Sequence, residues 1–93
     1  METERRFTTL DLYLSSFFIL QGIEPDLEIK GNKVAFLFEP SDKLYRLMSE
    51  FNSNTDVPIA DYVTCLKVLR GRMLTLKEHI PGNGNRKKYG NGI

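Results

Sequence analysis

The chain has 93 residues, of which 41% are hydrophobic, so it is long enough for one domain with a single core and too short for a second. Its single cysteine, Cys65, excludes an intramolecular disulfide and a thiolate zinc cluster and suits a reducing compartment, so we expect a cytoplasmic protein. The net charge is +1, but the charges are unevenly distributed along the chain. Residues 1–61 hold 6 basic and 11 acidic side chains (net −5), whereas residues 62–93 hold 7 basic and 1 acidic side chain (net +6).

The first predicted element is a helix over Thr8–Gly22, which follows a polar N-terminus, residues 1–6, that we expect to be flexible. Thr8 is the predicted N-cap of a capping box with Asp11, Phe7 and Leu12 form a hydrophobic staple, and Gly22 suits an αL C-cap. At helical spacing the apolar side chains fall on two faces. The broad face holds Leu10, Tyr13, Leu14, Phe17, Phe18 and Leu20, and the second holds Leu12 and Ile19 beside the small Ser15 and Ser16.

A membrane span or a signal peptide is the alternative interpretation of this apolar run. Its uninterrupted part, Leu12–Leu20, is well short of the roughly 20 residues that a span requires. Acidic residues precede it, and no small-x-small cleavage site follows it. We therefore expect a helix at the centre of a soluble domain, with no membrane contact.

A β-hairpin is the clearest signal in the chain, with strands over residues 25–30 and 33–39 on either side of Gly31-Asn32. Pairing Lys30 with Lys33 places Ile29 opposite Val34 and Leu27 opposite Phe36, on a face that we expect to cover the first helix. Ala35 and Leu37 then lie on the outer face. As one strand of a two-stranded ribbon, residues 33–39 are expected to have a free edge.

Two further helices are predicted. The first has Ser41 as N-cap and ends at Asn52-Ser53-Asn54. Its buried stripe is Leu44, Leu47, Met48 and Phe51. The second begins near Val57 with Pro58 at N1, and Gly71 is a point where it frays or bends. Its inner stripe is Ile59, Tyr62, Val63, Leu66, Leu69 and Met73.

The element order predicts a small single α+β domain over residues 7–80, with the topology helix–β-hairpin–helix–helix. The first helix is expected to be sandwiched between the two-stranded ribbon and the later helices. Residues 81–93, which are rich in glycine, asparagine and basic side chains, are expected to be a flexible basic tail.

Three segments resemble a known family. They are Phe-Thr-Thr-Leu-Asp-Leu-Tyr-Leu-Ser-Ser at 7–16, Lys-Val-Ala-Phe-Leu-Phe-Glu at 33–39, and a Tyr-x3-Leu-x2-Leu helix at 62–69. They are similar to a family of short bacterial and phage proteins known only as a domain of unknown function. The resemblance covers about residues 7–74, and departs from the family where Ser15-Ser16 replaces Ala-Ala. It implies the fold and an accessory or mobile-element context, and it supplies no site residues.

Catalytic chemistry has little support in the sequence. A nucleophile needs a base within hydrogen-bond reach, and the only histidine, His79, follows Cys65 by fourteen residues. The nearest carboxylate cluster, Asp26, Glu28 and Glu39, alternates along the hairpin, so we expect no metal site. No phosphate-binding loop is present in the sequence. We therefore expect a protein that is not an enzyme and needs no cofactor.

Two binding surfaces remain as candidates. The first is a nucleic-acid interface in the basic C-terminal region, where cations neutralise phosphates and Tyr89 stacks on an unpaired base. Its residues are Lys67, Arg70, Arg72, Lys77, Arg86, Lys87, Lys88 and Tyr89. The alternatives are that these charges only keep the protein soluble, or that the tail lies on an acidic surface. The second is an adaptor or inhibitor surface for a protein partner, or a homodimer, through the outer hairpin face, with Ala35, Leu37 and Tyr45.

Overall fold

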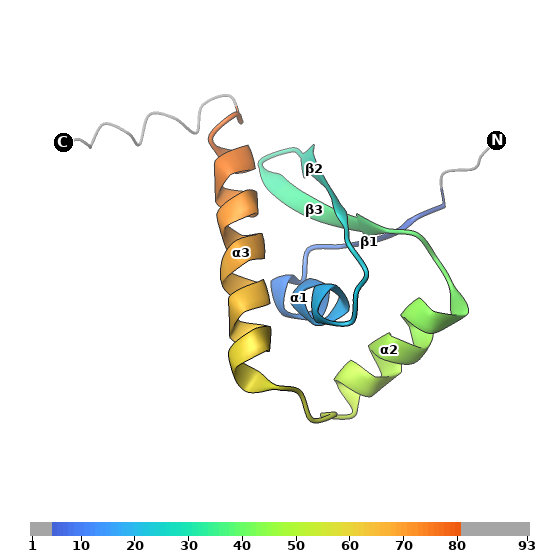
Figure 1. The fold of residues 1–93 in the computed structure, drawn as a ribbon. Helices are drawn as coiled ribbons and strands as arrows, with labels where there is room; N and C mark the ends of the chain where they lie inside the picture. Colours follow the sequence, from blue (N-terminus) through green and yellow to red (C-terminus); the bar gives the residue numbers. More distant parts are fainter. Residues whose placement is uncertain (1–4, 81–93) are drawn as a thin grey trace.

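The structure is a computed structural model that describes residues 5–80. Its described part contains three helices and one three-stranded antiparallel sheet of order β1-β3-β2 (Figure 1). The elements in chain order are β1 (Phe7–Thr9), α1 (Leu12–Leu20), β2 (Asp26–Lys30), β3 (Lys33–Phe38), α2 (Asp42–Asn52) and α3 (Ile59–Lys77). The predicted α+β class and the helix–hairpin–helix–helix order are confirmed, whereas the expected two-stranded ribbon has a third strand. The flexible ends that we predicted include residues 1–4 and 81–93, which lie outside the described residues.

The first helix begins later than predicted. Asp11 is its N-cap, and the Asp11 carboxylate accepts hydrogen bonds from the backbone N–H groups of Tyr13 at 2.9 Å and Leu14 at 3.1 Å. The predicted capping box and staple at Thr8 are therefore wrong. Residues 7–9 form β1 instead, which pairs antiparallel with β3 from Phe7↔Phe38 to Thr9↔Phe36. Two consecutive β-branched threonines favour a strand, and pairing with β3 satisfies their backbone groups.

The predicted end of the first helix is confirmed. Gly22 has φ +91°, the left-handed conformation that glycine adopts without steric cost. The N–H of Gly22 donates to the carbonyl of Ile19, and the N–H of Ile23 donates to the carbonyl of Phe18, both at 2.9 Å. These two bonds are those of a Schellman motif, which turns the chain from α1 toward β2.

The hairpin register is the predicted one, with Lys30↔Lys33, Ile29↔Val34 and Leu27↔Phe36. Gly31 has φ +66°, as a two-residue turn with glycine in first position requires. β3 lies between β1 and β2, so both of its edges are paired. The free edge expected at residues 33–39 is therefore wrong, and the hairpin strand with only one neighbour in the described residues is β2.

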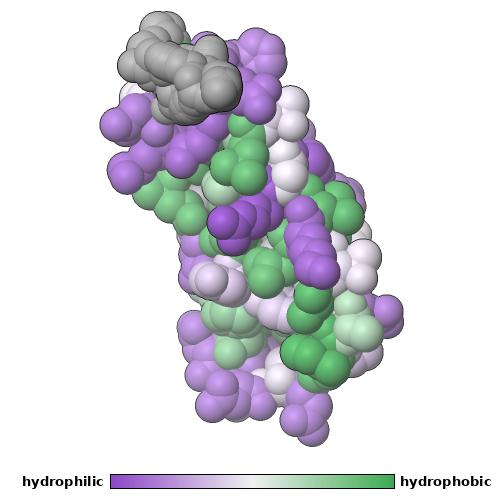
Figure 2. Space-filling view, turned by 90° about the vertical axis from the view of Figure 1, so that its left-hand side faces the viewer, coloured by the Kyte–Doolittle hydropathy of each residue, from purple (hydrophilic) through white to green (hydrophobic). Residues whose placement is uncertain are grey.

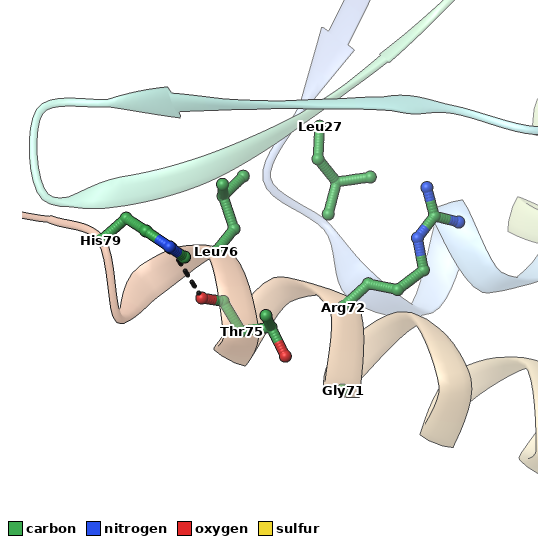
Figure 3. A pocket seen from close by; sticks show the side chains of 6 residues that line it. All are labelled: Leu27, Gly71, Arg72, Thr75, Leu76 and His79. Atoms are coloured by element: carbon green, nitrogen blue, oxygen red, sulfur yellow. Dashed lines mark hydrogen bonds between the residues drawn. The ribbon is translucent and has the colours of Figure 1, made fainter.

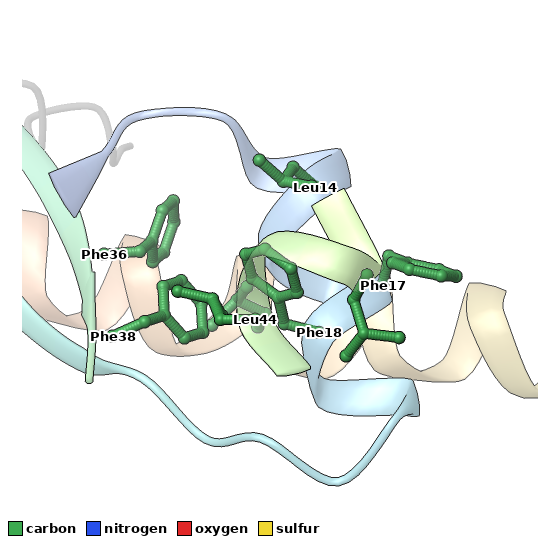
Figure 4. Packing of buried hydrophobic residues seen from close by; sticks show 8 residues of the cluster. Leu14, Phe17, Phe18, Phe36, Phe38 and Leu44 are labelled. Atoms are coloured by element: carbon green, nitrogen blue, oxygen red, sulfur yellow. The ribbon is translucent and has the colours of Figure 1, made fainter. Parts of the chain in front are cut away.

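The core lies where α1 meets the inner face of the sheet and the other two helices (Figure 4). Phe18 packs edge-on against Phe38, with ring centroids 4.8 Å apart, and Phe17 packs against Phe51 at 5.7 Å. The buried residues of the cluster are Leu14, Phe17, Phe18, Phe36, Phe38, Leu44, Leu47 and Leu69. They come from α1, β3, α2 and α3, so α1 is central to the core, as predicted.

The two sides of α1 differ from the prediction in detail. Leu10 and Tyr13, expected on the buried face, are exposed, whereas Leu12 and Ile19 pack against the core. Ser15 and Ser16 are fully buried, and α1 packs against α3. Small side chains let two helix backbones approach closely, which agrees with two packed sides of α1.

The later helices follow the prediction closely. In α2, Ser41 is the N-cap and accepts a hydrogen bond from the N–H of Leu44 at 3.0 Å. In α3, Pro58 precedes the first helical residue, and the helix continues through Gly71 to Lys77. Leu69 is fully buried, but Ile59, predicted to be on the inner stripe, is 67% exposed. The start of α3 therefore extends beyond the core that its middle covers.

Candidate functional site

The predicted cations of α3 lie on two different sides of the helix. At about 100° per residue, Lys67, Arg70 and Lys77 fall within roughly 80° of one another, whereas Arg72 points to the other side. Lys67 and Arg70 are exposed, and Lys77 is half-buried. Figure 2 shows the surface on the α3 side of the molecule, where hydrophilic and hydrophobic side chains are interleaved. Three of the four predicted contacts, Lys67, Arg70 and Lys77, therefore form a stripe along one side of α3, and Arg72 lies apart from it.

Arg72 is held by an acidic neighbour. Its guanidinium Nη1 lies 3.3 Å from Oε1 of Glu24, which belongs to the segment between α1 and β2. The Arg72 side chain is 43% exposed and that of Glu24 is 68% exposed, so water screens this ion pair and its contribution to stability is small.

A groove runs between β2 and the C-terminal half of α3 (Figure 3). Leu27 points from the strand toward the helix, and Leu76 points from the helix toward the strand. The groove has a volume of about 700 Å³ and is lined by Leu27, Gly71, Arg72, Thr75, Leu76 and His79. It therefore combines an apolar floor with one guanidinium and one imidazole, and its lining residues include no carboxylate.

The imidazole of the groove has a defined neighbour. Nδ1 of His79 lies 3.2 Å from the carbonyl oxygen of Thr75, at the end of α3. Since a carbonyl oxygen can only accept, Nδ1 donates its N–H to Thr75, and the other ring nitrogen, Nε2, does not take part in this hydrogen bond. The end of the helix thus positions the ring beside the groove.

The second predicted surface, on the outer hairpin face, is largely covered. Ala35 is 1% exposed and Leu37 is 8% exposed, so the expectation that they offer apolar surface to a partner is wrong. Leu37 lies between Thr8 of β1 and Asp26 of β2 in the sheet, and the Arg6 guanidinium forms an ion pair with Asp26. Tyr45 is exposed, and its ring packs edge-on against Phe7 with centroids 6.4 Å apart.

The residues considered for catalysis are not brought together. Cys65 and His79 are separated by most of α3, which rises about 18 Å between Cys65 and Lys77. In residues 5–80, no three side chains from histidine, cysteine, aspartate and glutamate gather as a metal site would require. None of the helices in these residues has the length and apolar character needed to cross a membrane.

The Tyr62 hydroxyl has a raised pKa. Burial raises the pKa of the Tyr62 hydroxyl above its ordinary value of 10.0, and the negative charge of Asp11 and the nearby Tyr13 raise it further. The Tyr62 hydroxyl donates to the backbone carbonyl of Tyr13. This shift belongs to the contact between α1 and α3, which lies outside the groove.

Several groove residues were not predicted as functional. The sequence predicts Gly71 only as a weak point of its helix, and Leu27 only as a core residue. A glycine inside a long helix is the sequence signal that could have drawn attention to this position, and the structure shows open space where a Cβ of Gly71 would lie. Arg86, Lys87, Lys88 and Tyr89, the remaining predicted nucleic-acid contacts, lie outside the described residues.

Comparison with known proteins agrees with the resemblance noted in the sequence. The model of one family, described as "Domain of unknown function (DUF5659)", matches residues 4–75. Curated proteins and solved structures gave no match. The matched range includes β1, α1, the hairpin, α2 and most of α3. The chain therefore belongs to the DUF5659 family of domains of unknown function.

Proposed function

We propose that this domain is a small non-enzymatic binding module whose basic C-terminal region contacts nucleic acid without sequence preference. The observation that carries the proposal is the stripe of Lys67, Arg70 and Lys77 on one side of α3. In sequence, the stripe leads toward Arg86, Lys87 and Lys88. The family resemblance supports an accessory or mobile-element role, and the single Cys65 supports a cytoplasmic location.

The stripe has a length suited to a phosphate backbone. From Lys67 to Lys77 the helix rises about 15 Å, a length of duplex axis over which each strand presents roughly four phosphates. Arg72 lies on the other side of the helix and is paired with Glu24, so it contributes less than its neighbours. Leu69 packs on the core, whereas Lys67 and Arg70 are exposed on the stripe.

Binding through these cations depends on counterion release. If about four to six of the basic side chains contact phosphates, log K falls against log[salt] with a slope of roughly −3 to −5. Fluorescence anisotropy with a labelled single strand and a labelled duplex, titrated over a range of salt concentrations, measures this slope. Sequences of different base composition should bind with similar affinity, because phosphate contacts carry no base information.

Charge reversal on the stripe has a matched control. Lys67→Glu with Arg70→Glu should weaken binding and flatten the salt slope. Lys43→Glu with Arg46→Glu reverses two exposed charges at the same spacing on α2, and should have a much smaller effect. If both double variants bind alike, the stripe is not the interface.

The tail is tested separately. Deleting residues 81–93 removes Arg86, Lys87 and Lys88, and should flatten the salt slope further without changing the melting temperature. Tyr89→Ala should weaken single-strand binding by ~1–3 kcal/mol and leave duplex binding nearly unchanged, since only unpaired bases stack. Absence of binding at low salt overturns the proposed function.

A further inference from the structure

We propose that the groove between β2 and α3 binds an acidic segment of a partner protein in extended conformation, which adds as a strand to the free edge of β2. Three observations carry this inference: the edge of β2 with which no strand pairs in residues 5–80, the shape of the groove beside it, and the charge of its lining. It goes beyond the nucleic-acid contact, because it uses the groove instead of the stripe of Lys67, Arg70 and Lys77, and it involves a different kind of partner.

The backbone of β2 offers hydrogen-bonding groups on its free edge. Bonded and non-bonded pairs alternate in an antiparallel ladder, and the two-residue turn is closed by the Lys30–Lys33 pair. Glu28 therefore bonds to β3, whereas Leu27 and Ile29 direct their N–H and C=O groups away from it. In the described residues no strand pairs with this edge. An extended peptide can bond to Leu27 and Ile29 as the next strand.

The groove receives the alternate side chains of such a peptide. A strand beside β2 lies about 4.8 Å farther out, and every second side chain points to the same face as Leu27. On that face the peptide meets Leu76 and the open space over Gly71, where an added Cβ has no neighbour within 4 Å. The volume of about 700 Å³ accommodates more than one such side chain.

The charge of the groove selects an acidic occupant. The Arg72 guanidinium lines it, and the Glu24 carboxylate that pairs with Arg72 is largely exposed, so an incoming carboxylate can take its place. A planar guanidinium binds a carboxylate through two parallel hydrogen bonds. The peptide therefore alternates apolar and acidic side chains on the face that points into the groove.

Two other occupants fit less well. The C-terminal segment of this chain carries Arg86, Lys87 and Lys88, which Arg72 would repel. A second copy pairing through its own β2 would direct Leu27 and Ile29 into the groove. Its carboxylates Asp26 and Glu28 would stay on the outer face, and Arg72 would gain no partner.

The first test selects ligands with the full chain. Displayed random ten-residue peptides are selected on the immobilised protein, and the enriched peptides are synthesised with a fluorescent label. We expect the enriched sequences to have an acidic or apolar residue at every second position, because alternate side chains of a strand point to the same face. The proposal is overturned if no sequence is enriched on the protein relative to a support without protein, or if the enriched sequences are basic.

Variants then locate the binding site. Arg72→Glu and Gly71→Leu, which fills the groove, should each weaken peptide binding by roughly tenfold or more. Lys67→Glu makes the same charge change on the other side of α3, and Thr64→Leu adds the same side chain outside the groove lining, so both should bind the peptide normally. Circular dichroism checks that each variant is folded. Equal binding by all four variants overturns the proposal.

Amide exchange tests the mode of binding. Bound peptide should slow hydrogen–deuterium exchange of the Leu27 and Ile29 amides, and leave that of Glu28, which already bonds to β3, nearly unchanged. Unchanged exchange at Leu27 and Ile29 in the saturated complex contradicts strand addition. Failure of the nucleic-acid proposal is distinguishable, since oligonucleotide binding responds to Lys67 and Arg70, and peptide binding responds to Gly71 and Arg72.

Discussion

The Tyr62 hydroxyl donates a hydrogen bond of 2.9 Å to the backbone carbonyl of Tyr13, and joins α3 to the first turn of α1 across 49 residues of sequence. Because this bond lies at the exposed border of the core, we expect Tyr62→Phe to lower the free energy of unfolding by about 0.5–1 kcal/mol. Urea denaturation measures it. Tyr13→Phe keeps the accepting carbonyl and changes only an exposed side chain, so it should leave the stability unchanged.

The same tyrosine predicts a pH dependence. Burial, followed by the charge of Asp11 and by Tyr13, raises the Tyr62 pKa above 10.0 in the folded protein. The neutral phenol is therefore favoured by folding, so this contribution to stability is complete below pH 10.0 and is lost as pH rises through the raised pKa. Ultraviolet titration of wild type should show one tyrosine ionising late, and Tyr62→Phe should lack it. Identical titration curves would contradict the assignment.

The position of the first helix cap is testable by truncation. Asp11 accepts hydrogen bonds from two backbone N–H groups, so Asp11→Ala should cost about 0.5–2 kcal/mol. Thr8 lies exposed in β1 and caps nothing, so Thr8→Ala should cost less. Chemical denaturation of both variants compares them. A larger loss for Thr8→Ala would place the helix start where the sequence alone suggests it.

The two buried serines should respond differently to truncation. Among the described residues, the Ser15 hydroxyl is buried without a hydrogen-bond partner, whereas that of Ser16 donates to the carbonyl of Leu12 at 2.8 Å. Ser15→Ala removes an unsatisfied polar group and should raise the free energy of unfolding by ~1 kcal/mol. Ser16→Ala should be neutral or slightly destabilising. Thermal unfolding of both variants tests this, and destabilisation by Ser15→Ala would show that its hydroxyl is satisfied.

Replacing Gly71 and replacing Gly22 by alanine should change the stability in opposite directions. Gly71 lies inside α3 with open space at its Cβ position, so Gly71→Ala should stabilise by about 0.5–1 kcal/mol through helix propensity. Gly22 has φ +91°, so Gly22→Ala should destabilise by about 1 kcal/mol, although its Cβ would also meet no neighbour within 4 Å. Melting temperatures moving in the same direction for both variants would contradict this account.

Much of the fold was predictable because its signals are local. Gly31-Asn32 specified the hairpin and its register, Ser41 specified the start of α2, and Gly22 specified the end of α1. Each depends on backbone conformation and hydrogen bonds within a few residues. The start of α1 was mispredicted because Thr8 and Asp11 are both competent N-caps, and only pairing with β3 draws residues 7–9 into a strand.

Some features of the candidate sites follow from the sequence alone, and others depend on the tertiary structure. The sequence by itself determined the charge of the C-terminal region, the apolar stripes and the turns, because these follow from residue type and spacing. Only the tertiary structure decided that β1 covers one edge of β3, that β2 has no second strand neighbour within residues 5–80, and that Arg72 pairs with Glu24, 48 residues away. Such contacts depend on how distant elements pack, which no local pattern encodes.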